Sequence, residues 1–162
     1  MLKISRMSDY AIVLLTTLAR GETPQSNARA LAERTGLSQP TVGKLLKTLT
    51  ASGLLTSQQG RHGGYRLARA ADEISIADIV EAIDGPIAMT ECYTADHDCE
   101  REANCSVRPH WNTINRGVRE LLTGTTLATL SEPVHQVPIW FKRDSTGVAK
   151  SAPVARTTSG KP

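Results

Sequence analysis

The chain of 162 residues is poor in aromatic side chains, with one Phe, two Trp and three Tyr. A packed core must therefore be built mainly from Leu, Ile, Val and Ala. Long apolar runs are also missing. The opening stretch MLKISRMSDYAIVLLTTLAR is broken by polar residues, is too short to span a bilayer and lacks a small-residue cleavage site. These absences predict a cytoplasmic protein with no membrane partner.

Catalytic motifs are missing as well. The sequence has no phosphate-binding glycine loop, no H-E-x-x-H motif and no convincing Ser/His/Asp set. A thiol nucleophile formed by Cys105 and His110 would leave the other cysteines without a role. We therefore expect no enzyme. The net charge of +3 permits binding to nucleic acid without establishing it.

Apolar residues recur at helical spacing in five stretches, and capping or stop residues flank most of them. The predicted helices cover residues 8–20 with Ser8 as the cap, 27–35, 38–52, the stretch ISIADIVEAIDG, and 109–130.

Between the third and fourth helices, LLTSQQGRHGGYRLAR reads as a hairpin, because two short strand-like runs flank its glycines. The predicted fold class is mainly α: a winged helix-turn-helix with a β-hairpin wing, followed by a long C-terminal helix that is able to serve a partner helix.

The third helix is the predicted DNA-reading element. Its apolar residues Val42, Leu45, Leu46 and Leu49 share one face and should pack inward. Amides and hydroxyls near the start of such a helix can hydrogen-bond base edges, and basic side chains can neutralise phosphates. The alternative is a small helical domain with a solvated polar face. The residues predicted to contact a double-stranded DNA operator are Ser38, Gln39, Thr41, Lys44, Lys47, Arg61 and His62.

All three cysteines of the chain, Cys92, Cys99 and Cys105, lie in the polar stretch ECYTADHDCEREANC. Three thiols so close together in a cytoplasmic protein favour ligation or redox chemistry over disulfides. The spacing of six and then five intervening residues differs from the paired C-x-x-C of zinc ribbons. From spacing alone, zinc, a thiol switch and an iron–sulfur cluster all remain open.

The arrangement as a whole resembles the winged-helix iron–sulfur regulators that include IscR, NsrR, RirA and the SUF-operon regulators. The resemblance covers about residues 1–131. It is carried by MLKISRMSDYAI, LAERTGLSQPTVGKLLKTLTASGLL, GRHGGYRLAR, ISIADIVEAIDGP and the cysteines before a long helix. The segment CSVRPHWNTIN is most similar to the SUF-assembly regulators.

This resemblance implies a homodimer, built through the long helix after the cysteines, with an iron–sulfur cluster in each subunit. The expected parts are a winged helix-turn-helix DNA-binding domain (1–85), a cluster-binding cysteine loop (86–108) and a dimerisation helix (109–131). The composition of the remaining residues (132–162), rich in Pro, Ser, Thr, Gly and basic residues, predicts a disordered tail. Within the tail, Ile139, Trp140 and Phe141 are an apolar exception that could dock on the body or on a partner.

The resemblance also assigns cluster ligands. Cys92, Cys99 and Cys105 would be the three thiolates, but Arg108 stands where IscR-like proteins place a histidine. The fourth ligand would be Asp9 of the other subunit, as in NsrR-like proteins, or His110, with His97, a glutamate or water as further alternatives. The alternative for Asp9 is a carboxylate favoured by the helix dipole. A 2Fe–2S cluster is slightly favoured, and a 4Fe–4S cluster also fits.

The implied function is cluster-sensing regulation, as a repressor, of genes for iron–sulfur cluster assembly by the SUF system. One alternative keeps DNA binding but makes nitric oxide or thiol oxidation the signal. Another is a zinc-stabilised interaction module without a regulatory cluster.

Overall fold

The computed structural model describes residues 4–21, 25–60, 63–90, 93, 99 and 104–132. The chain divides into two compact units, Met1–Glu132 and Pro133–Pro162, and the second unit lies outside the described residues. The predictions for Cys92, Arg61, His62 and His97, and for the tail with Ile139, Trp140 and Phe141, also lie outside them.

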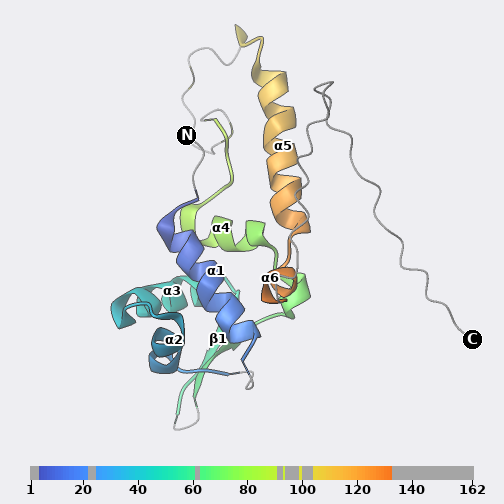
Figure 1. Ribbon diagram of the computed structural model, residues 1–162. Coiled ribbons are helices and arrows are strands. Elements are labelled where there is room, and N and C mark those ends of the chain that lie inside the picture. The colour runs from blue at the N-terminus through green and yellow to red at the C-terminus, as the bar shows by residue number, and fades with distance from the viewer. Residues whose placement is uncertain are drawn as a thin grey trace, which may run out of the picture. The chain divides into compact units, whose positions relative to one another are not determined.

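The first unit has the element order of a winged helix-turn-helix, as the sequence predicts. Its α1 is the central element, in contact with α2, α3, α4, α6 and β2 (Figure 1). In chain order the described elements are α1 (Arg6–Ala19), α2 (Ala28–Thr35), α3 (Gln39–Ala51), β1 (Leu55–Gln58), β2 (Gly64–Leu67), the short 3-10 helix η1 (Ala71–Glu73), α4 (Ile76–Asp84), α5 (Arg108–Gly124) and α6 (Leu127–Ser131).

Side-chain caps explain where most of these helices begin. Asn27 Oδ1 accepts a hydrogen bond from the Ala30 amide at 2.8 Å, and Ser75 Oγ accepts from the Asp78 amide at 3.1 Å. At α1 the prediction of Ser8 as the cap is wrong. The cap is Ser5, whose hydroxyl accepts from the Ser8 amide at 3.1 Å. Ser8 itself is fully buried in the first turn of the helix.

The core is aliphatic, as the lack of aromatics requires. It joins residues from α1, α2, α3, β1 and α4, and one leucine of α6 completes it. Each fully buried leucine contributes about 1.5–3 kcal/mol of transfer free energy. The largest fully buried apolar side chains are Leu14, Leu15, Leu31, Leu45, Leu46, Leu49, Leu55, Ile74, Ile79 and Leu127.

The wing is a two-stranded antiparallel hairpin whose register runs from Leu55 opposite Leu67 to Gln58 opposite Gly64. Ser26 extends it, because its backbone exchanges hydrogen bonds of 3.0 and 2.8 Å with Tyr65. A Cβ at Gly64 would lie 2.8 Å from the Ser26 carbonyl oxygen, so only glycine fits there. The base of the wing is therefore fixed on the segment before α2.

The long helix expected over 109–130 is two helices, α5 and α6. The helical conformation is interrupted at Thr125 and Thr126, which have extended backbone angles. Here the backbone pairs with the start of α4: the Ile76 amide donates to the Thr125 carbonyl at 2.9 Å, and the Leu127 amide donates to the Ile74 carbonyl at 2.8 Å. The Thr126 hydroxyl then caps α6.

An arginine at the end of α1 holds the C-terminal end of the folded unit. Arg20, at the end of α1, donates from Nε to the Ser131 carbonyl at 2.7 Å and from Nη2 to the Leu130 carbonyl at 2.8 Å. These carbonyls lie at the end of α6, where helical partners run out. Arg20 therefore caps the C-terminal helix of the unit.

Candidate DNA-binding face and cysteine segment

The inward face of α3 is as predicted, with Val42, Leu45, Leu46 and Leu49 all fully buried. The helix begins at the predicted place because Ser38 caps it, accepting from the Thr41 amide at 3.4 Å. The Ser38 and Thr41 hydroxyls also bond each other at 2.8 Å. Two of the predicted DNA contacts thus already take part in the helix cap.

The opposite face of α3 is open to solvent. Within the described residues, neither Lys44 nor Lys47 forms an ion pair, whereas Arg29 on α2 is paired with Glu33 at 3.0 Å. The two lysines therefore present positive charge that no neighbouring carboxylate neutralises. The exposed residues of α3, which we call the exposed face of α3, are Gln39, Pro40, Gly43, Lys44, Lys47 and Ala51.

The wing tip residues Arg61 and His62 are not described, but the hairpin carries a basic residue that sequence reasoning missed. Arg66 on β2 is exposed and donates from Nε to the Thr56 hydroxyl at 3.1 Å. The period-two alternation of the strand could have identified it, because its neighbours Tyr65 and Leu67 pack against the core.

A partly buried hydrogen bond joins α1 to the end of α4. The Ser8 hydroxyl donates to Asp84 Oδ2 at 2.8 Å, and the Ser5 amide donates to the same oxygen at 3.4 Å. Partial burial raises the pKa of Asp84, but the hydrogen bonds from Ser8 and Ser5 outweigh it and leave the pKa below its ordinary value. Asp84 is followed by Gly85, whose φ of 86° ends the helix.

The cysteine segment (residues 86–107) leaves α4 at this point and returns to the start of α5. Its first part is fixed to the middle of α5 by a hydrogen bond of 3.0 Å from the Met89 amide to Asn115 Oδ1. Its last part turns into α5, where the Trp111 amide donates to the Val107 carbonyl at 3.1 Å. Hydrogen bonds to residues of α5 therefore hold both ends of the cysteine segment.

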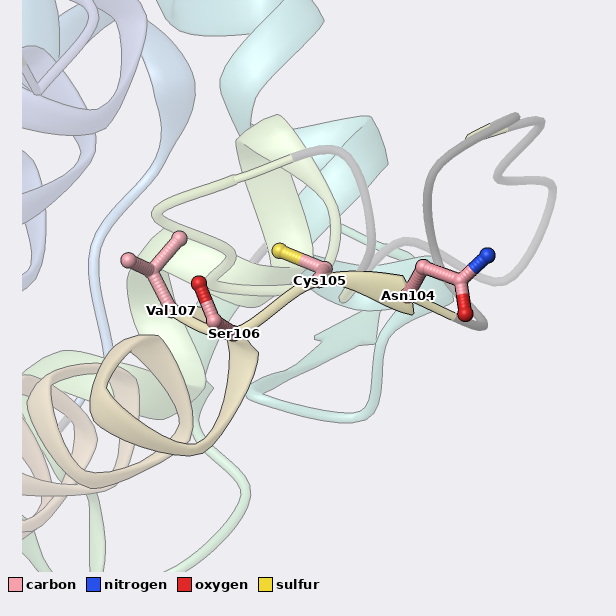
Figure 2. A pocket seen from close by; sticks show the side chains of 4 residues that line it. All are labelled: Asn104, Cys105, Ser106 and Val107. Carbon is pink, nitrogen blue, oxygen red and sulfur yellow. The ribbon is translucent and has the colours of Figure 1, made fainter.

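Two of the three cysteines can be placed. Cys99 is exposed, Cys105 is half-buried, and neither forms a disulfide. Cys105 lines an open pocket of about 440 Å³ together with Asn104, Ser106 and Val107. In Figure 2 its sulfur projects from the backbone just before α5 begins. An unpaired thiol beside an open space, as at Cys105, is chemically suited to a soft-metal or iron–sulfur group.

The candidates for a fourth ligand lie on two different helices. Asp9 is exposed in the first turn of α1, next to the buried Ser8. His110 is exposed in the first turn of α5, and its amide donates to the Val107 carbonyl at 3.1 Å. Among the residues that can be placed, no three His, Cys, Asp or Glu side chains are grouped to hold a metal ion. Cys92 and His97 are not among them.

The helix α5 has no buried residue, although it is amphipathic. It is tied to α4 through Arg119, which pairs with Glu81 at 3.2 Å. The described part of the chain contains no helix long and apolar enough to cross a membrane. The large apolar side chains exposed on α5 and just before it are Val107, Trp111, Ile114 and Leu121.

Relatives of known sequence cover most of the chain. Residues 4–133 match the family described as Rrf2, iron-dependent transcriptional regulator. The Rrf2 protein of Nitratidesulfovibrio vulgaris is 31% identical over 138 residues, which cover 85% of this chain and 92% of that protein. The transcriptional regulator CymR of Bacillus subtilis is 32% identical over 132 residues, which cover 80% of this chain and 90% of CymR.

Solved structures of transcriptional regulators also match this chain. The structure of CymR, the global cysteine regulator of B. subtilis, superposes with a TM-score of 0.63 at 33% identity and covers 81% of this chain and 97% of CymR. The structure of IscR from T. potens has a TM-score of 0.61 at 28% identity and covers 84% of this chain and 93% of that IscR. These matches confirm the predicted fold class. The chain belongs to the Rrf2 family of DNA-binding transcriptional regulators and is not an enzyme.

Proposed function

We propose that this protein is an iron–sulfur-cluster-sensing repressor of genes for cluster assembly by the SUF system. The observation that carries the proposal is the position of the cysteine segment. It connects α4 of the winged domain to α5, and its described thiols, Cys99 and Cys105, are accessible and unpaired. A group that binds several of these thiols links the two helices.

The proposed ligands are the thiolates of Cys92, Cys99 and Cys105. The fourth ligand is Asp9 of a second subunit or His110, both of which have exposed side chains. These residues would hold an iron–sulfur cluster, with 2Fe–2S favoured over 4Fe–4S, and such a cluster would be lost under iron limitation or oxidation. The three thiolates would share the cluster as a common partner, and loss of that partner is the proposed signal.

The contacts at the ends of the segment support a route from the cysteines to the DNA-binding domain. Met89 bonds to Asn115 on α5, and Asp84, at the root of the segment, bonds to Ser8 on α1. A ligand regulates only if it favours one of two conformations by a difference in binding free energy. Fixing the cysteine segment would bias how α5 sits on α4, where Arg119 pairs with Glu81.

Operator binding is assigned to the exposed face of α3, and α5 is assigned to a homodimer. Regulators with a recognition helix commonly bind two half-sites as dimers, so that two such helices enter successive major grooves. The apolar residues exposed on α5 are suited to cover those of a second copy. Arg61 and His62 at the wing tip remain predicted contacts to the minor groove or the DNA backbone.

The test of the cluster is anaerobic purification with iron, sulfide and visible-absorption measurements. We expect iron and sulfide in the wild type and loss of both, with loss of colour, in Cys99→Ala and Cys105→Ala. Ser57→Ala is the control, since Ser57 is exposed on β1, does not line the pocket beside Cys105 and should leave the cluster in place. Asp9→Ala and His110→Ala then identify the fourth ligand by altered spectrum and cluster lifetime.

The same measurement separates the alternatives. Zinc without sulfide would support a zinc-stabilised module, and a protein that remains free of iron after reconstitution would exclude the cluster. A thiol-oxidation signal is favoured by one observation, the exposed and unpaired thiol of Cys99. It predicts a change in DNA affinity on oxidation of metal-free protein. Nitric oxide sensing predicts bleaching of the spectrum together with loss of DNA binding.

A further inference from the structure

Gly43 stands in the interior of α3, where glycine is among the least favourable residues because it leaves the unfolded backbone most free. The fold gives no reason for it. Its backbone is not in the left-handed region, and a Cβ built on it would meet nothing within 4 Å. An alanine would therefore fit the folded chain and stabilise the helix.

Gly43 and its neighbours on the same side of α3 are exposed to solvent. It lies on the exposed face of α3, one turn after Gln39 and one turn before Lys47, with Lys44 next to it. Neither lysine forms an ion pair within the described residues. The centre of a basic and polar face is thus left without a side chain.

We propose that Gly43 is a specificity-determining residue that lets the DNA approach the bare backbone of α3. A side chain at this position would hold the helix away from the floor of the major groove, whereas glycine allows a base-pair edge to come into contact. The neighbouring Gln39 and Lys47 can then reach base edges and phosphates on either side of the contact. This inference rests on the proposed assignment of α3 as the DNA-reading helix.

The test separates protein stability from DNA affinity. A duplex is first selected by the full-length wild-type protein from a randomised pool, and its affinity is measured at one salt concentration. For Gly43→Ala we expect a thermal midpoint higher by about 2–4 °C, and affinity for the selected duplex about tenfold weaker. Gly43→Val should bind more weakly still, because its side chain is larger.

Matched variants provide the controls. Thr50→Val is a stabilising change on the same helix, at a residue outside the exposed face of α3 whose hydroxyl is buried and, among the described residues, has no hydrogen-bond partner. It should raise the midpoint and leave affinity unchanged, with the molecular mass checked by light scattering. Lys44→Ala and Lys47→Ala report whether α3 faces the DNA, and both should weaken binding and lower its salt dependence.

The outcomes distinguish this inference from the assignment on which it rests. If the lysine variants bind weakly but Gly43→Ala binds like wild type, the role of Gly43 is overturned and the face stands. If all three bind like wild type, both are overturned. Repeating the selection with Gly43→Ala should yield a changed base preference, and an unchanged preference would also overturn the specificity role.

Discussion

Thr50, near the end of α3, has a polar group in an environment that does not satisfy it. Its hydroxyl is buried and, among the described residues, has no hydrogen-bond partner. Threonines elsewhere in the fold behave differently: the Thr35 hydroxyl donates to the Leu31 carbonyl at 2.6 Å. A buried hydroxyl without a partner costs about 1–3 kcal/mol in desolvation. Thr50 is therefore a local defect in an otherwise well-packed helix.

Replacing Thr50 with valine should remove this defect at nearly constant shape and helix propensity. We expect Thr50→Val to raise the thermal midpoint by about 2–4 °C, measured by circular dichroism. Thr50→Ser, which keeps the hydroxyl and loses the methyl group, should lower it. A midpoint for the valine variant below that of the wild type would show that the hydroxyl has a partner in solution.

At the scale of elements, one carboxylate makes the polar contact between the start of α1 and the end of α4. Asp84 accepts hydrogen bonds from Ser8 and Ser5, and its pKa lies below the ordinary value. Because the folded state holds the carboxylate charged, this contact stabilises the protein above the ordinary aspartate pKa of about 3.9. The stabilisation is lost as the pH falls through the lower pKa of the folded state.

The prediction is a difference that depends on pH. Urea unfolding of Ser8→Ala at pH 7 should show a loss of about 0.5–1.5 kcal/mol relative to the wild type. The difference should shrink as the pH falls from about 3.9 through the lower pKa of Asp84 in the folded state, where its carboxylate becomes protonated. Asp84→Asn should show less pH dependence than the wild type over the same range. A constant deficit of Ser8→Ala down to pH 2 would mean that Ser8 acts through packing alone.

At the scale of the whole molecule, α5 presents apolar side chains that the described part of the chain does not cover. Leu121 is 63% exposed, although it belongs to a strongly amphipathic helix. Exposed apolar surface gathered on one helix commonly marks an interface. This is the face on which the proposed homodimer depends.

A charge on that face should separate the subunits. We expect Leu121→Glu to be monomeric at micromolar concentration by analytical ultracentrifugation, since two carboxylates would be buried without partners. Thr123→Glu is the control, because it adds the same charge at an exposed position on the polar side of α5 and should leave the mass unchanged. A dimer that persists in Leu121→Glu would place the interface elsewhere.

Local signals made much of the fold predictable. Asn27 and Ser38 cap helices where the sequence indicates, and Gly36, with a φ of 70°, ends α2. The failures have non-local causes. Ser8 has a side chain typical of a helix cap, but it is buried in the first turn of α1, and its hydroxyl donates to Asp84, 76 positions away. The inward and outward faces of α3 were predictable from helical spacing, whereas the cysteine ligation stays a prediction because Cys92 lies outside the described residues.

The break between α5 and α6, which was not predicted from the sequence, is stabilised by pairing with residues about fifty positions earlier. Extended backbone at Thr125 and Thr126 bonds to the start of α4, and this places Leu127 in the core. The sequence Gly124-Thr125-Thr126 carried a signal for a helix stop and a new cap. The apolar periodicity on either side of it favoured a single helix instead.

The placement of Leu127 has a consequence for the order in which the protein is made. The winged domain is not one continuous stretch, since α6 returns after the cysteine segment and α5 to fill the space against α1. On the ribosome, the recognition helix therefore emerges early but gains its complete core only after residue 131 has left the exit tunnel. By then all three cysteines are outside, so the whole cysteine segment has emerged before the winged domain has finished folding.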